Sequence, residues 1–496
     1  MGTTTFTVGA ALRSGVVRTV GGSLTTFLLL PLILDRLEAS VYGAWATLAT
    51  LLAIGSLADV GVRTEIVRRA SEAHARGNRS AAAAAVREGT TLVAALAAIV
   101  AAAAILAAPR IVAWVFGTGG TAGTDEGQLA LLLRALAALL AVSLVLDTYL
   151  SGLAALQRLD YRNYGQTAGL LLATLVVVAS LLAGWGIWSL LAGACVERLT
   201  TVAVEWYGMS RLLPEATFRP ARLRWASAGA FLALSGTALL TQISDIVDFQ
   251  WDKLVIAHYV GPAAVAQYEV GTTLTMQVRN IAIFPLGLLL AGVAGAAVAG
   301  LQRARHVHDR IARPVVAVAA VALSAVVVFG PPAVRLWLGD DFEPAGYVSR
   351  ILAVAMSINL ISAASTYVAF ARKHHAIPAT SAAINVVVNG VGSLLLTRRL
   401  GLLGAVYGSV LGNAAGLLTA VWLLGRLSPP RGVFVRPVAT AAVLAAVGIA
   451  VGLPEASTTW ISLISRTAAY GAVVTGVLTV TGDLRPREIV RAIRAR

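Results

Sequence analysis

The sequence contains little charge, one cysteine and only two lysines. Charged residues make up 13% of its 496 residues, whereas about a quarter of the residues are charged in a typical soluble domain. Cys195 is the single cysteine, which excludes an intramolecular disulfide and a CxxC metal site. The two lysines, Lys253 and Lys373, follow Asp252 and Arg372, so the Gly-Lys pair of a phosphate-binding P-loop is missing. The chain therefore has no ATPase motor of this type.

Catalytic motifs and large loops are missing as well. The sequence has no HExxH metalloprotease motif and no GxSxG nucleophile elbow. No connector between its apolar segments is long enough to hold a catalytic domain. The histidines at 306, 308, 374 and 375 stand in basic connectors without acidic or cysteine partners, which does not favour a metal site. We therefore predict that the protein is not an enzyme and has no cofactor or metal.

Long apolar runs are what the sequence does contain. Hydrophobic residues make up 58% of the chain, and its mean hydropathy is +0.80. A run of about 20 apolar residues can span a bilayer as a helix, whereas a β-barrel would show short alternating segments. We predict an all-α polytopic membrane protein with about fourteen spans. These are placed near residues 14–35, 41–62, 88–116, 128–154, 165–184, 187–209, 231–259, 262–285, 314–337, 346–371, 376–397, 401–424, 436–453 and 459–481.

The distribution of arginine predicts the orientation of these spans. Most basic residues lie in alternate connectors, at 63–87, 158–162, 211–224, 303–313, 372–373 and 426–436, and in the tail 485–496. The positive-inside rule places these connectors and both termini in the cytoplasm. We predict a multi-pass protein of the inner (cytoplasmic) membrane. The net charge of +15 is then explained by basic loops beside anionic lipid headgroups, and no nucleic-acid partner is expected.

Residues 281–301 are apolar enough to form a further span. Such a span would move the arginines of connector 303–313 to the outer side of the membrane, against the positive-inside rule. We therefore expect a long eighth helix that is broken at Pro285, because a proline removes one backbone hydrogen bond.

A weak internal repeat predicts the domain organisation. "LEASVYGAW" at 37–45 aligns with "VGPAAVAQY" at 260–268, and "GIWSLLAG" at 186–193 aligns with "GLLGAVYG" at 401–408. Chance similarity between Ala/Gly/Leu-rich helices is the alternative explanation. Parallel repeats are typical of transporters whose substrate site lies between the repeats. We predict an N-terminal six-helix half at 1–225, a C-terminal six-helix half at 226–430, and two further helices with a basic tail at 431–496.

The seventh span carries an unusual polar face. Asp245, Asp248 and Asp252 are spaced i, i+3 and i+7, so they share one side of a helix, and Gln242 extends it. An ionised side chain in the middle of a membrane costs about 2.5–3.5 kcal/mol, so these groups should face water, a partner or a ligand.

Two interpretations of this face remain open. In one it lines a translocation cavity, where Lys253 holds an anionic headgroup and one carboxylate exchanges H⁺ or Na⁺ as the coupling ion. In the other it forms a buried ion-pair network, in which Lys253 together with Arg279 or Arg18 neutralises the acids. Glu269 in the eighth span is a further cavity candidate.

Two arginines lie inside otherwise apolar spans. Arg18 and Arg134 are candidates to bind a pyrophosphate, because a guanidinium can hold phosphate oxygens through two parallel hydrogen bonds. The alternatives are that Arg18 extends to the inner membrane surface and that Arg134 pairs with Asp147 or Glu197. A group at the end of the second span, formed by Asp59, Arg63 and Glu65, is interpreted as a local charge cluster.

Four segments resemble Wzx-type polysaccharide flippases of the multidrug/oligosaccharidyl-lipid/polysaccharide (MOP) exporter superfamily. "LPLILDRLEASVYGAWATLATLLAIGSLADVGVRTEIVRRASEAHARGN" resembles their first two helices and the following loop. "WDKLVIAHYVGPAAVAQYEVG" is similar to their junction of helices 7 and 8, and "VVFGPPAVRLWLGDDFEPA" to the end of helix 9. "VVNGVGSLLLTRRLGLLGAVYGSVLGN" is similar to their hairpin of helices 11 and 12. The resemblance covers roughly residues 10–425, in the order of the family, although 285–301 is more apolar than is usual there.

The resemblance implies a fold and a function. The fold is MATE-like, with two six-helix bundles arranged as a V around a central cavity and two additional helices. The function is to move a polyprenyl-pyrophosphate-linked oligosaccharide from the cytoplasmic to the outer leaflet by alternating access, with a glycan polymerase and glycosyltransferases as partners. The alternatives are a cation-coupled multidrug exporter of the same superfamily and a membrane glycosyltransferase or polymerase.

Overall fold

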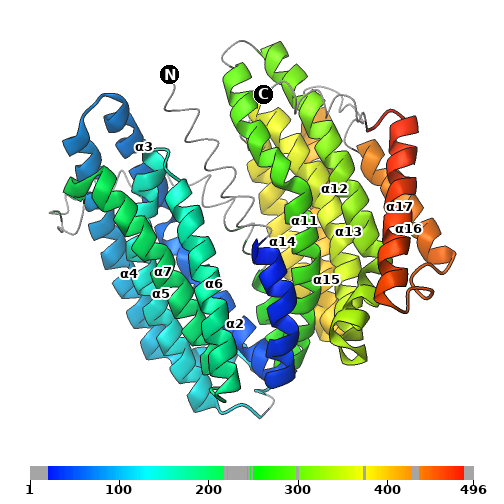
Figure 1. Cartoon of the computed structure of the whole chain (residues 1–496), viewed down its shortest axis with the longest axis horizontal. Helices are drawn as coiled ribbons and strands as arrows, with labels where there is room; N and C mark the ends of the chain where they lie inside the picture. The colour runs from blue at the N-terminus through cyan, green and yellow to red at the C-terminus, as the bar shows by residue number, and fades with distance from the viewer. Residues whose placement is uncertain are drawn as a thin grey trace. The chain divides into compact units, whose positions relative to one another are not determined.

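The computed structural model describes residues 21–121, 123–216, 250–297, 301–371, 376–425 and 435–484, together with residues 221, 243 and 246. All regular elements in these ranges are helices (Figure 1), which confirms the predicted fold class. Eight of the described helices are long and apolar enough to cross a membrane, and two shorter apolar helices, Ala39–Gly55 and Val435–Ala450, accompany them. The chain is a multi-pass membrane protein.

The chain forms two compact units. The N-terminal unit comprises residues 1–246 and 257–266, and the C-terminal unit comprises residues 247–256 and 267–496. The boundary that the sequence predicts between residues 225 and 226 lies outside the described residues.

The N-terminal unit contains helical residues 21–36 and then α2 (Ala39–Gly55), the 3₁₀ turn η1 (Ser56–Asp59), α3 (Val60–Ala75), α4 (Arg79–Val115), α5 (Glu126–Ala155), α6 (Asp160–Leu182), α7 (Trp188–Leu212) and the 3₁₀ turn η2 (Pro214–Ala216). Local capping sets two of the helix starts. The side chain of Asn78 accepts a hydrogen bond from the amide of Ala81 at the start of α4, and Asp125 accepts one from Gln128 at the start of α5. The predicted second span, 41–62, is not one helix: it comprises α2, η1 and the start of α3, because η1 interrupts it.

The hairpin of α6 and α7 is packed closely at two glycines of α6. A Cβ atom at Gly165 would lie 2.9 Å from the carbonyl oxygen of Thr201, and one at Gly169 would lie 2.6 Å from that of Glu197. Small residues of this kind let two membrane helices approach through their backbones. The close approach fixes the polar residues at the start of α6 beside those of α7.

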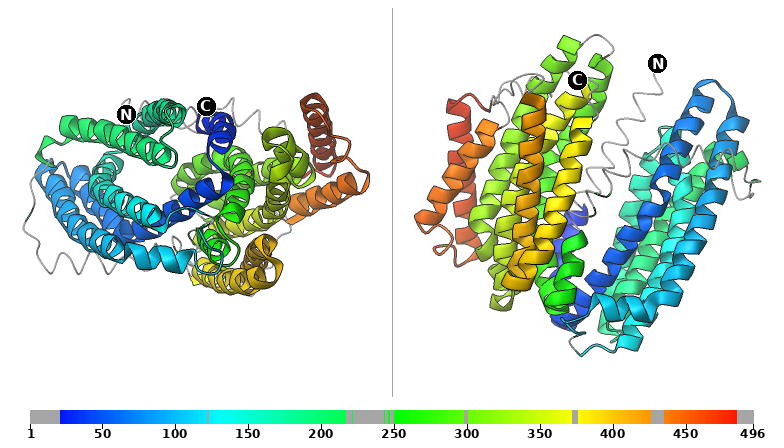
Figure 2. Two further views of the ribbon diagram at one scale, coloured as in Figure 1. Left: turned by 90° about the horizontal axis from the view of Figure 1, so that it is seen from below. Right: turned by 180° about the vertical axis from the view of Figure 1, so that it is seen from behind.

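The C-terminal unit contains the first residues of α10 (Asp252–Tyr259), most of α11 (Pro262–Ala297), and then α12 (Leu301–Leu338), the 3₁₀ turn η4 (Asp340–Phe342), α13 (Glu343–Ala371), α14 (Ala376–Leu400), α15 (Leu402–Gly425), α16 (Val435–Ala450) and α17 (Trp460–Val480). α11 confirms the long eighth helix. The expected break at Pro285 is wrong, because α11 is helical through this position: a proline removes one hydrogen bond of the helix and leaves those on either side. Orange α16 and red α17 lie along α12 (Figure 2), and their buried core includes Tyr470 and Val474.

The hairpin of α14 and α15 joins a polar face to a glycine face. Five buried polar side chains of α14 repeat every four residues, and the glycines of α15 repeat at the same spacing. A Cβ atom at Gly412 would lie 2.5 Å from both Asn385 Oδ1 and Asn389 Cβ, so only glycine fits there. A single residue, Gly401, joins the two helices with a φ of +61°, which favours glycine. The two faces consist of Ser381, Asn385, Asn389, Ser393 and Thr397 on α14, and Gly404, Gly408, Gly412 and Gly416 on α15.

Candidate functional site

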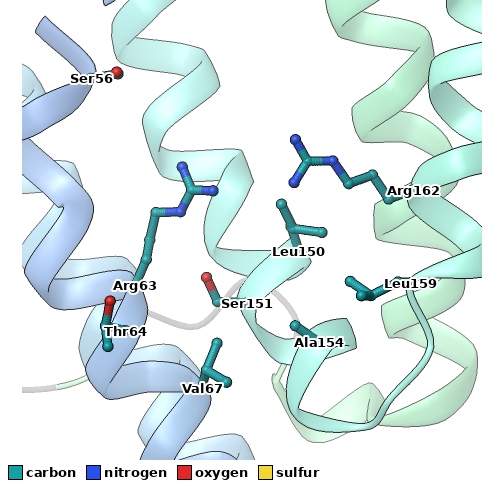
Figure 3. Close-up of a pocket in the computed structure, with 9 residues that line it drawn as sticks. All are labelled: Ser56, Arg63, Thr64, Val67, Leu150, Ser151, Ala154, Leu159 and Arg162. Atoms are coloured by element: carbon teal, nitrogen blue, oxygen red, sulfur yellow. The ribbon is translucent and has the colours of Figure 1, made fainter. Parts of the chain in front are cut away.

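An open cavity of about 360 Å³, lined by both polar and apolar side chains, lies in the N-terminal unit among η1, α3, α5 and α6. Figure 3 shows Arg63 of α3 and Arg162 of α6 reaching into it from opposite sides. The volume is in the range of a small-ligand site. Its lining residues are Ser56, Arg63, Thr64, Val67, Leu150, Ser151, Ala154, Leu159 and Arg162.

Arg63 is held in place by two carboxylates. Its Nη1 lies 3.5 Å from Asp59 Oδ2 and 3.5 Å from Asp147 Oδ2. The other oxygen of Asp147 accepts a short hydrogen bond from Nη2 of Arg198 on α7, which also lies 3.2 Å from the carbonyl oxygen of Ser143. Asp147 therefore bridges Arg63 and Arg198, and this bridge connects α3, α5 and α7.

Arg162, the second arginine of the cavity, lacks the carboxylate partners that Arg63 and Arg198 have among the described residues. Its guanidinium makes no hydrogen bond or ion pair within the described residues, although Glu205 and Asp147 attract it through space. A partly buried guanidinium without a direct partner is costly, because its desolvation is not repaid. Arg162 thus presents to the cavity a set of donors that no described residue engages, and a guanidinium suits the oxygens of a phosphate or carboxylate.

A buried carboxylate near these arginines, Glu205, lies on α7. Glu205 is fully buried, and neither of its oxygens accepts a hydrogen bond from a described residue. Its electrostatic neighbours are Asp147, Arg198, Arg162 and Arg63. Five elements of the N-terminal unit therefore bring three arginines and three carboxylates together. This set, which we call the charge cluster, consists of Asp59, Arg63, Asp147, Arg162, Arg198 and Glu205.

A salt-bridge ladder continues along α3 below the charge cluster. Glu65 is buried, and its carboxylate accepts hydrogen bonds of 2.6 Å from Nη2 of Arg68 and from Nε of Arg69. The hydrogen bond from Arg68, followed by the one from Arg69, holds the pKa of Glu65 below its usual value against the effect of its burial. Glu65 is thus held as a carboxylate that fixes the polar end of α3.

The C-terminal unit holds a second polar cluster, centred on Asp252. This carboxylate is fully buried; Oδ1 accepts a hydrogen bond of 2.6 Å from Ser393, and Oδ2 accepts bonds of 2.6 Å from Ser409 and 2.9 Å from Tyr268. Three hydroxyl donors stabilise the ionised form of the carboxylate. The polar face of α14 therefore meets the start of α10 at Asp252.

The cluster contains more oxygen acceptors than Ser393 can serve. The Ser393 hydroxyl lies 2.6 Å from Asp252 Oδ1, 3.0 Å from Asn389 Oδ1 and 3.2 Å from the carbonyl oxygen of Ala405, and it has one proton for these three oxygens. A buried carboxylate with further oxygens close to it suits a proton or a hard cation.

The other predicted site residues of this unit, Lys253, Glu269 and Arg279, all have polar partners. Lys253 is buried and forms an ion pair with Glu269, with 2.6 Å between Nζ and Oε2. Nη2 of Arg279 donates to Asn359 Oδ1 at 3.2 Å, and Nδ2 of Asn359 donates to Asn413 at 3.0 Å. Three of the predicted residues, Asp252, Lys253 and Glu269, thus lie where the start of α10 meets α11. Arg18, Gln242, Asp245 and Asp248 lie outside the described residues.

Arg134 lies away from the charge cluster, on an exposed part of α5. Its Nε donates to the carbonyl oxygen of Ile105 at 3.3 Å. In an α-helix this carbonyl would accept from the amide of residue 109, but Pro109 lies there and has no N–H group. Arg134 therefore occupies the acceptor that the proline leaves unpaired.

A double-mutant cycle tests this function of Arg134. Replacing Arg134 by leucine should lower the free energy of unfolding by about 1 kcal/mol, because it exposes an unpaired carbonyl to lipid. The same replacement in a Pro109→Ala background should cost measurably less, since the alanine amide then bonds Ile105. Reversible unfolding in lipid or mild detergent gives the four free energies. Equal costs in both backgrounds would show that Arg134 acts elsewhere.

Arg162 and Glu205 are two residues of this site that the sequence did not single out. Arg162 is one of the basic residues of the predicted connector 158–162, but it lies in the first turns of α6 and lines the cavity. Glu205 is a lone acid in the apolar stretch "VAVEWYGM" of a spanning segment, and such residues are functional candidates by default. That rule would have selected Glu205.

Comparison with known proteins places this arrangement in a family. The family model described as "Polysaccharide biosynthesis protein" matches residues 33–346. No curated protein matches the chain. Among solved structures, the lipid II flippase MurJ in an inward closed conformation is similar with a TM-score of 0.67 at 9% identity, covering 96% of this chain and 98% of that one.

Two further structures, both described as transporters of the MOP superfamily, are similar as well. An inward-facing MATE family transporter has a TM-score of 0.62 at 16% identity, over 84% of this chain and 98% of that one. A MOP superfamily transporter from Pyrococcus furiosus, described as having a binding pocket of reverse polarity, has a TM-score of 0.56 at 16% identity, over 84% and 95%. The chain thus belongs to the polysaccharide biosynthesis protein family, and it has the fold that the lipid II flippase and the MATE family transporter share.

Proposed function

We propose that the protein moves a polyprenyl-pyrophosphate-linked oligosaccharide from the cytoplasmic to the outer leaflet of the inner membrane by alternating access, with both termini in the cytoplasm. The observation that carries this proposal is Arg162, which has no direct partner in the described residues and faces a cavity together with Arg63. Moving a sugar headgroup through hydrocarbon unaided is prohibitive, because its polar groups lose their hydrogen bonds to water. An anion site inside a membrane-spanning unit lowers that barrier for a pyrophosphate.

The charge of the cavity favours this cargo over a cationic drug. Both guanidinium groups that reach the cavity are permanently charged, so a cationic drug there would be repelled. The carboxylates Asp59 and Asp147 are already engaged with Arg63. The multidrug-exporter alternative therefore has less support, although its fold is the same.

We propose that the oxygen cluster around Asp252 binds the coupling ion, a proton or Na⁺. The support is the fully buried carboxylate of Asp252 and the further oxygens, those of Asn389 and Ala405, that lie close to the Ser393 hydroxyl. Binding of a cation there would neutralise the buried carboxylate and so change the stability of one conformation relative to another. The proposed partners are the glycosyltransferases that assemble the cargo and the polymerase that receives it.

Reconstituted vesicles test the proposed function. Purified protein should transfer a fluorescent polyprenyl-pyrophosphate oligosaccharide between leaflets, measured by the access of a lectin or quencher that cannot cross the membrane. Empty vesicles and vesicles with the Arg162→Gln variant are the controls. Export of cationic dyes without movement of the lipid-linked sugar would favour the multidrug alternative, and incorporation of labelled sugar by the protein alone would favour an enzyme.

A further inference from the structure

We propose that Glu205 takes up a proton when the cavity of the N-terminal unit binds a pyrophosphate anion. Cargo binding would then carry a proton with it, at a residue separate from the cation site around Asp252. The inference rests on the proposed anion site and adds a proton-binding group to it.

The first step is the charge balance of the charge cluster. Its three arginines and three carboxylates are formally neutral when the cavity is empty. A disubstituted pyrophosphate carries two negative charges, and entry of such an anion leaves the cluster with an excess of negative charge. An uncompensated charge in a buried site is strongly unfavourable. The cluster must therefore gain a positive charge or lose a negative one.

The second step is to ask which group of the cluster can change its charge. The arginines remain protonated at all accessible pH values, so only a carboxylate can respond. Asp147 accepts hydrogen bonds or ion pairs from both Arg63 and Arg198, and Asp59 is paired with Arg63. Asp147 is therefore held ionised by two arginines, whereas Asp59 has one oxygen paired with Arg63 and its other oxygen, Oδ1, accepts no hydrogen bond from a described residue.

Glu205 has no arginine partner on either oxygen among the described residues, whereas Asp59 keeps its ion pair with Arg63. It is fully buried, and both of its oxygens lack a hydrogen-bond partner in the part of the chain that the structure describes. The charged groups that act on it are Asp147 of α5, Arg162 of α6, Arg198 of its own helix and Arg63 of α3. A phosphate that binds Arg162 and Arg63 removes much of their attraction for Glu205 and adds a repulsion. Glu205 then holds a proton more strongly than it does in the empty cavity.

The sign of the effect follows from linkage. Because the filled cavity binds more protons than the empty one, the anion should bind more tightly at low pH. One proton taken up per anion corresponds to an affinity that falls up to about tenfold for each pH unit. A cavity in which protonation expelled the cargo would show the opposite slope.

Titration calorimetry on the full-length protein tests the proposal. The probe is a dialkyl pyrophosphate diester, whose own charge does not change between about pH 5.5 and about pH 8. Measuring its binding in two buffers with different heats of ionisation gives the number of protons taken up. We expect uptake of up to one proton per anion and weaker binding at high pH for the wild type. Binding without proton uptake at every pH across this range would overturn the proposal.

Two variants assign the proton to Glu205. Glu205→Gln should bind the diester without proton uptake, with an affinity that no longer depends on pH. Glu197→Gln, which removes another carboxylate of α7, is the matched control and should retain the uptake. Proton uptake that persists in Glu205→Gln would contradict the assignment. Should the glutamine variant fail to fold, the wild-type measurement in two buffers still decides whether binding is proton-linked.

A third variant separates this proposal from the proposed function. Arg162→Gln should lose most of the diester binding, as the anion site requires. If Arg162→Gln binds the diester as well as the wild type does, the anion site itself is wrong. If Arg162→Gln loses binding while the wild type binds without taking up protons, the anion site stands and only the role of Glu205 is wrong.

Discussion

Replacing Arg162 by glutamine is expected to abolish flipping of the lipid-linked oligosaccharide while the protein stays folded. A hydrogen bond to a charged group contributes about 1.5–3 kcal/mol, so loss of one bidentate contact should weaken anion binding by roughly one to two orders of magnitude or more. Arg162→Lys should retain part of the activity, because it keeps the charge but not the planar pair of donors. Leaflet transfer in vesicles, together with binding of the diester, measures the effect.

The arginine on α7 supplies the control for this variant. Arg198→Gln removes a partner of Asp147 and should destabilise the N-terminal unit, whereas Arg162 has no direct partner to leave behind among the described residues. The midpoint temperature of thermal unfolding should therefore be lower in Arg198→Gln than in the wild type, and nearly unchanged in Arg162→Gln. Normal transport by Arg162→Gln would remove the main support for an anion site in this cavity.

Replacing Asp252 is expected to have the largest effect on stability. Asp252→Ala leaves Ser393, Ser409 and Tyr268 without their shared acceptor in a fully buried place, and should lower the free energy of unfolding by about 3–5 kcal/mol. Asp252→Asn keeps the volume and one oxygen acceptor, so most of the protein should fold. Denaturant unfolding of the purified protein distinguishes the two variants.

Transport by the asparagine variant tests the proposed coupling site. The asparagine side chain of Asp252→Asn has no charge to neutralise. Transport by this variant should therefore no longer depend on pH, if wild-type transport does, or on Na⁺, if wild-type transport does. Ser381→Ala is the matched control, because Ser381 lies on the polar face of α14 about three turns away from Ser393, the residue of this face that contacts Asp252. An unchanged ion dependence in Asp252→Asn would mean that the driving force enters at another residue.

The sequence predicted the helical membrane fold because hydropathy and the arginine distribution act over whole segments. It also indicated Asp252 and Lys253 as polar residues that need partners. Their partners could not be predicted, because they depend on tertiary packing: Asp252 lies against Ser409, which is 157 residues later, and Lys253 pairs with Glu269 on the next helix. A helical face derived from spacing alone assigns neighbouring residues to one surface or another, but it does not identify what covers that surface.

The anion cavity shows a different limit of sequence analysis. From the sequence alone, Arg63 is explained by its neighbours Asp59 and Glu65 at the end of one span. The positive-inside rule explains Arg162 as a residue of a cytoplasmic loop. Both interpretations are sufficient to explain a basic residue near the end of a span. Only the packing of α3 and α6 around α5 shows that these two arginines, 99 positions apart, face one cavity (Figure 3).

The joined faces of α14 and α15 bear on how the chain is made. α14 leaves the ribosome first, and alone it would expose a row of serine, asparagine and threonine side chains to lipid. The glycine face that covers this row belongs to α15, and only Gly401 separates the two helices. Because neither helix hides its polar groups without the other, the pair should leave the translocon together, as one hairpin. A mutation that weakens the glycine face would therefore reduce the amount of inserted protein before it affects transport.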